Sequence, residues 1–206
     1  MDFASVLPLA FVMIAGPQII SAFFFATSDS WKRTSAAYVL GASVSITAVV
    51  TVAYLLAKGI TSTGEEGESG PSTIDYVIVG LLVLAMVNQF RGRRKAEPPK
   101  WMGKLQGATP KLALTLGFLL LGFFPSDLVT SVTVGGHLAN HGNPWVDAVP
   151  FIAFTLLLLA LPALFVALLG QRAQTQLPKA RDWMNDNSWI VSEIVIVFFI
   201  AIILAG

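Results

Sequence analysis

Residues 112–134 read LALTLGFLLLGFFPSDLVTSVTV, an apolar stretch that is long enough to cross a bilayer and holds a single carboxylate. Proline cannot donate a helix hydrogen bond, so Pro125 predicts a break inside this span, with Asp127 close behind it. An ionised carboxylate inside a bilayer costs several kcal/mol unless it is paired, hydrated or protonated. The stretch therefore predicts an interrupted membrane helix with a polar site at its break.

Composition places the whole chain in the membrane class. Of its 206 residues, 55% are apolar and 12% are charged, against about 25% charged in a soluble domain. The mean hydropathy is +0.72. No Asp, Glu, Lys, Arg or His lies between Arg33 and Lys58 or between Asp147 and Arg172. The chain has no cysteine, which excludes disulfides, thiolate catalysis and thiolate-bound zinc.

Hydropathy predicts an all-α integral membrane protein with six transmembrane helices. The first apolar stretch opens with Met1 and Asp2 rather than a basic segment, so we interpret it as a retained span and not as a signal peptide. The tryptophans fall between the spans or at their ends, as an interfacial aromatic belt requires. The predicted spans are residues 3–25, 38–56, 74–90, 112–134, 149–169 and 188–205.

Basic residues set the predicted orientation. Lys and Arg gather in the odd-numbered connections, which the positive-inside rule places in the cytoplasm, so both termini would face outside. The third connection, residues 91–111, is the most basic. It is either a linker that only sets topology or a patch that contacts anionic lipid headgroups. The residues that would make this contact are Arg91, Arg93, Arg94 and Lys95.

The two halves of the chain predict an inverted repeat. An offset of 108 residues places Pro17 on Pro125 and each span of residues 1–90 broadly over a span of residues 112–206. Three spans in each half force the halves into opposite orientations. Many secondary transporters share this architecture, with interrupted helices at matching positions around a midplane site.

The candidate substrate or coupling-ion site therefore combines both breaks. In Ala15-Gly16-Pro17-Gln18, Gly16 and Pro17 interrupt the first helix, and Gln18 supplies a polar side chain beside the break. The fourth helix contributes Pro125, Ser126 and Asp127. Glu193, one or two turns into the sixth span, is a second carboxylate for proton coupling or for a hydrated position near the surface.

Nothing in the sequence predicts an enzyme. GxSxG, HExxH and P-loop motifs are absent, and we expect no cofactor and no nucleic-acid partner. His137 and His141 are four residues apart, but no third metal ligand has suitable spacing. We expect the segment 135–141 to be a solvated loop that binds no metal.

The chain resembles the actinobacterial Sap/Gap group, the sulfolipid- and glycopeptidolipid-addressing proteins of the LysE superfamily. The residues that carry the resemblance are the two breaks and the segment Pro98-Pro99-Lys100-Trp101-Met102. It implies a small cytoplasmic-membrane protein that moves envelope glycolipids outward, in some cases beside a large RND-type lipid transporter. The superfamily often has Asn before the second proline. Here Phe124 takes that place, which leaves the substrate class open.

Three hypotheses follow. In the first, a lipid headgroup contacts Gln18, Ser126 and Asp127 while its acyl chains stay in the bilayer. In the second, Asp127 or Glu193 couples proton exchange to export of amino acids or other small solutes. In the third, the chain is a scaffold whose basic linker recruits a partner. The low polarity of the spans favours the first, and the sequence leaves self-association open.

Overall fold

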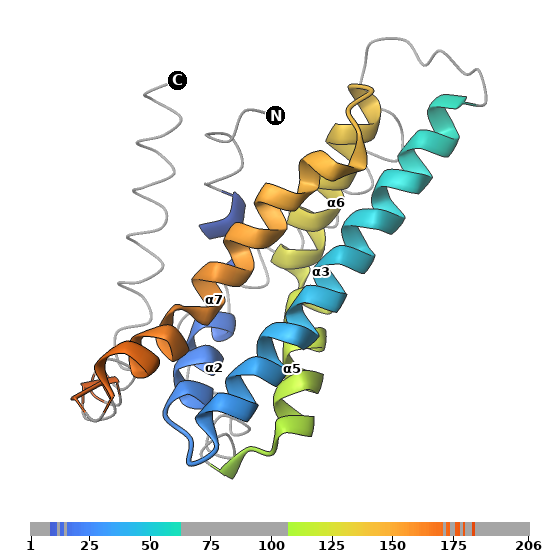
Figure 1. The fold of residues 1–206 in the computed structure, drawn as a ribbon. Helices are drawn as coiled ribbons and strands as arrows, with labels where there is room; N and C mark the ends of the chain where they lie inside the picture. The colour runs from blue at the N-terminus through green and yellow to red at the C-terminus, as the bar shows by residue number, and fades with distance from the viewer. Residues whose placement is uncertain are drawn as a thin grey trace.

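The computed structural model describes residues 9–62 apart from 12 and 15, residues 107–170, and positions 172, 173, 176, 177, 179 and 183. In these parts of the chain every regular element is helical (Figure 1). The predicted spans 74–90 and 188–205, Glu193 and the four basic linker residues lie outside them. The elements are α2 (Pro17–Ala26), α3 (Trp31–Ser62), α5 (Pro110–Phe123), α6 (Pro125–Asn140), η3 (Trp145–Ala148) and α7 (Val149–Leu169).

The apolar helices identify a membrane protein. Within the described ranges, Trp31–Gly59 and Trp145–Leu169 are each long and apolar enough to cross a bilayer. The α5 and α6 helices form a third candidate span if they are taken together, since they meet at a bend of 64°. The mean helix direction thus changes sharply at the predicted break beside Pro125.

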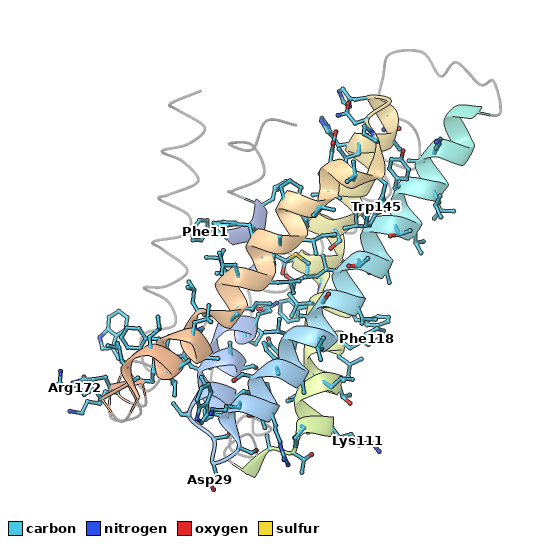
Figure 2. All side chains as sticks on the ribbon, in the orientation of Figure 1. Phe11, Asp29, Lys111, Phe118, Trp145 and Arg172 are labelled. Atoms are coloured by element: carbon cyan, nitrogen blue, oxygen red, sulfur yellow. The ribbon has the colours of Figure 1, made fainter. Side chains whose placement is uncertain are left out.

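The α3 helix organises the bundle. It contacts α2, α5, α6 and α7, and α5 and α6 follow one another along it (Figure 1). The short α2 helix lies against both α3 and α7. The bundle is elongated, with Asp29 and Lys111 at one end and Trp145 towards the other (Figure 2).

Glycines allow α3 and α5 to approach closely. A Cβ atom on Gly117 would collide with the carbonyl oxygen of Tyr38, and one on Gly41 would collide with that of Leu114. One turn beyond, the Ser45 hydroxyl donates to the Phe118 carbonyl at 2.8 Å. Small residues and interhelical hydrogen bonds are the usual means of helix association in a membrane, where apolar contact with lipid is equally favourable.

Helix ends differ from the predicted spans. The α7 helix coincides with predicted residues 149–169, but α3 begins at Trp31 rather than at 38. Lys32 and Arg33 therefore belong to the first turn of α3. Their long side chains can still reach the membrane–water interface from there.

The prediction of a solvated loop at 135–141 is wrong. The α6 helix continues to Asn140, with His137 in its last turn and His141 at its C-cap. Glycine usually disfavours helix, but Gly135 packs directly against the α3 backbone at Val50. This packing outweighs the low helix propensity of the glycine.

Candidate functional site

Both prolines begin helices in the structure. Gly16 precedes α2 with φ +151°, and Phe124 separates α5 from α6 in an extended conformation. Pro17 and Pro125 each occupy the first helical position, where a missing N–H breaks no helix bond and the fixed φ favours helix. Each break therefore places the N-terminus of a helix inside the bundle.

The two breaks meet through Gln18 and Asp127. Gln18 Nε2 donates a hydrogen bond of 2.7 Å to Asp127 Oδ2, across 109 positions of sequence. Both side chains have 0% exposure. The Ser126 hydroxyl donates to the other carboxylate oxygen, Oδ1, at 3.1 Å. The structure thus brings together three of the polar residues that the sequence selected.

Tyr38 of α3 supports this contact by binding the backbone of Gln18. Its hydroxyl donates to the backbone carbonyl of Gln18 at 2.9 Å, and its ring packs on Phe25 at a centroid distance of 5.0 Å. The side chain is 1% exposed. Sequence reasoning missed Tyr38, because a single tyrosine at the start of a predicted span looks like an interfacial anchor.

Buried polar atoms without partners lie on the same two helices. Among the described residues, Gln18 Oε1, Ser21 Oγ and Ser131 Oγ are buried and make no hydrogen bond. Ser21 follows Gln18 by one turn, and Ser131 follows Asp127 by one turn, so helix geometry places each near its partner. We call Gln18, Ser21, Asp127 and Ser131 the polar cluster. The spacing from Gln18 and Asp127 was the signal in the sequence that identifies both serines.

The polar cluster has unused hydrogen-bonding capacity and a favourable field for negative charge. A buried polar group without a partner costs free energy, which a bound polar molecule can recover. Gln18 and Asp127 also lie in the first turns of α2 and α6, where the helix dipole carries partial positive charge. Half-helix N-termini of this kind bind anionic or polar groups in transporters.

The described residues contain no group of three His, Asp or Glu side chains that could hold a metal ion. The rings of His137 and His141 lie in tilted contact with centroids 3.9 Å apart, and Nδ1 of His141 contacts the His137 carbonyl at 2.9 Å. This pair lies at the C-terminal end of α6, whereas the polar cluster lies at its beginning.

Comparison with known proteins identifies a matching protein family but no individual protein that matches the chain. No curated protein and no solved structure matches the chain. The family described as Sap, sulfolipid-1-addressing protein, matches residues 6–206, which include both helix breaks and the whole polar cluster. Because the match covers nearly the full length, this membrane protein belongs to the Sap, sulfolipid-1-addressing protein, family.

Proposed function

We propose that this chain moves an envelope lipid, of the glycolipid kind, across or out of the cytoplasmic membrane. The observation that carries the proposal is the buried Gln18–Asp127 hydrogen bond between two helix breaks. It lies beside a core of buried apolar side chains, in a chain from a lipid-addressing family. The headgroup would bind in the polar cluster, and the acyl chains would remain in the bilayer.

The chemistry of the polar cluster fits a hydroxyl-rich headgroup. Gln18 Oε1 is an unused acceptor, while the hydroxyls of Ser21 and Ser131 can donate and accept. Sugar hydroxyls offer both functions at close spacing. The surrounding helices present large apolar side chains outward, such as Leu40 at 59% and Leu168 at 84% exposure, which suits contact with lipid chains.

The proposed architecture is a six-helix inverted repeat of the LysE type, with the halves 1–90 and 112–206 in opposite orientations and both termini outside. Two features support it. A proline opens the helix after each break, and the side chains that follow the two prolines contact each other. In such a repeat, alternating access rocks one half against the other around a central site.

Proton-coupled export of a small solute is the second candidate. The complete burial of Asp127 favours it, since a buried carboxylate that gains and loses a proton can couple transport to a proton gradient.

One experiment separates the two functions. The gene is deleted in its host, surface-extractable and total lipids are compared by mass spectrometry, and efflux of labelled amino acids is measured in the same strains. Retention of one lipid class inside the cell, reversed by the wild-type gene, is the result we expect. Loss of amino-acid efflux with unchanged lipids would favour the second candidate, and no change in either would contradict both.

We expect Gly16→Ala to impair export. The φ of +151° is strained for any residue with a side chain, and a Cβ atom would lie 2.8 Å from Gln18 Oε1. The strain should lower stability by about 1–3 kcal/mol and move Gln18 away from Asp127. Gly142→Ala is the matched control, because Gly142 has φ +67° with open space around it. Equal surface-lipid fractions in the two variants, at equal protein levels, would contradict the role of Gly16.

Tyr38→Phe should reduce export in part. It keeps the ring and removes the donor to the Gln18 carbonyl, at a cost of about 1–3 kcal/mol. Tyr54→Phe is the control, since the Tyr54 hydroxyl also donates to a backbone carbonyl, that of Asn143, at 3.1 Å. Both variants should lower the unfolding temperature, but only Tyr38→Phe should lower the surface-lipid fraction. A larger export defect in Tyr54→Phe would show that Tyr38 has no special part.

A further inference from the structure

A groove of about 290 Å³ lies between the beginning of α3 and the end of α7. On each helix the lining positions recur at the spacing of a single face. The α3 helix contributes Trp31, Lys32 and Ser35 among others, and α7 contributes Ala160, Ala163 and Ala167.

Small side chains keep this groove open. The α7 face carries an alanine at each of the three positions named, and α3 presents Ala36 opposite them. The two helices are therefore in contact without filling the space between their surfaces. Both belong to stretches long and apolar enough to span a bilayer, so the molecules that reach this groove are lipids.

Two polar residues, Lys32 and Ser35, line one end of the groove. Lys32 is exposed, and its Nζ lies 5.6 Å from the centroid of the Trp31 ring. One turn deeper, the Ser35 hydroxyl is without a hydrogen-bond partner, although the residue is only 8% exposed. Tryptophan and lysine at a helix start are typical of the membrane–water interface, where lipid headgroups lie. The groove thus joins apolar walls to a cation and an unused hydroxyl at headgroup depth.

We infer that this groove binds an anionic lipid, with an acyl chain against the alanines of α7 and a sulfate or phosphate headgroup on Lys32 and Ser35. The inference rests on the proposed function in one respect, namely that the bound lipid is cargo held before it reaches the polar cluster. Val39 at the inner end of the groove precedes Leu40 and follows Tyr38, whose hydroxyl holds Gln18. The groove therefore ends one residue along α3 from Tyr38, the residue that supports the cluster.

Fluorescence of Trp31 tests the site directly. The full-length protein is reconstituted into phosphatidylcholine vesicles that contain increasing amounts of brominated phosphatidylglycerol or brominated phosphatidylcholine. The contribution of Trp31 is the difference between the wild type and Trp31→Phe. The anionic lipid should quench Trp31 at about fivefold lower mole fraction than the zwitterionic one, as one lysine at the surface predicts.

Two pairs of variants at exposed positions complete the test. Lys32→Gln should abolish the preference for the anionic lipid, while Lys111→Gln, at the same end of the bundle (Figure 2), should retain it. Ala36→Phe should reduce quenching by both lipids, while Ala48→Phe, on the same helix but outside the groove, should not. Equal quenching by the two lipids in the wild type, or a preference that survives Lys32→Gln, would overturn the inference.

The quenching of Trp31 by lipid is measured without any export step, so this test can fail or succeed separately from the test of the proposed function. A protein that shows the lipid preference but no effect of gene deletion on surface lipids would contradict the proposed function and leave the groove as a lipid site. If the wild type shows no lipid preference and the Lys32→Gln variant exports lipid normally, only the inference that the groove binds an anionic lipid is contradicted.

Discussion

Cells that carry Asp127→Asn in place of the wild-type protein should retain the exported lipid at the level of the deletion strain. Asparagine keeps the size of the side chain and an oxygen that can accept from Gln18 Nε2, so the packing between α2 and α6 should persist. The negative charge is lost. Hydrogen bonds to charged groups contribute about 1.5–3 kcal/mol, so we expect a fall in export of about tenfold or more.

The control is Asp147→Asn, the same chemical change at an exposed carboxylate in η3. It should leave the surface-lipid fraction unchanged. Protein levels in the membrane must match, because the measured quantity is export per folded molecule. A wild-type surface fraction with Asp127→Asn would show that the charge of the buried carboxylate takes no part in lipid movement.

Gly117→Ala should destabilise the bundle by about 1–3 kcal/mol, the range for overpacking a close contact. The added methyl group would collide with the Tyr38 carbonyl and lie 3.0 Å from the Ala42 amide nitrogen. Since α3 and α5 meet there backbone to backbone, one helix must move. The measurement is the unfolding temperature of the purified protein in detergent, together with the amount of protein in the membrane.

Gly136→Ala provides the comparison. Gly136 lies in α6 and has open space where a Cβ would be, so alanine should be neutral or should stabilise the helix by up to about 1 kcal/mol. The same unfolding temperature for both variants would contradict close packing at Gly117. The contact with Tyr38 also links packing to the site, so Gly117→Ala should weaken export beyond its effect on protein amount.

Several features could be predicted from sequence because they depend on local chemistry. Residues 149–169 carry no charge, are apolar except for Thr155, and form α7 with the predicted bounds. Proline marks the breaks at 17 and 125, since it favours the first position of a helix. The resemblance to the Sap/Gap group is confirmed by the family match over residues 6–206.

Other features depend on contacts between distant segments. Tyr38 holds the Gln18 carbonyl, and Gly135 keeps α6 helical by packing on α3, and neither contact follows from a local pattern. Ser21 and Ser131 could be assigned to the site only from the contact between Gln18 and Asp127, because each serine lies one turn beyond one of these two residues. The sequence marks the charged and proline-broken positions as unusual, but the one-turn spacing of these two serines identifies them only once the contact between Gln18 and Asp127 is known.

Reconstitution tests most directly whether this chain moves lipid through the polar cluster. Vesicles are prepared from the total lipids of the deletion strain with purified wild-type or Asp127→Asn protein, and excess acceptor vesicles remove the lipid that is accessible from outside. Mass spectrometry then measures how much of the retained lipid class has been extracted. We predict that wild-type vesicles yield this lipid from both leaflets, while Asp127→Asn vesicles yield only the share of the outer leaflet. The same share from both proteins would contradict the account.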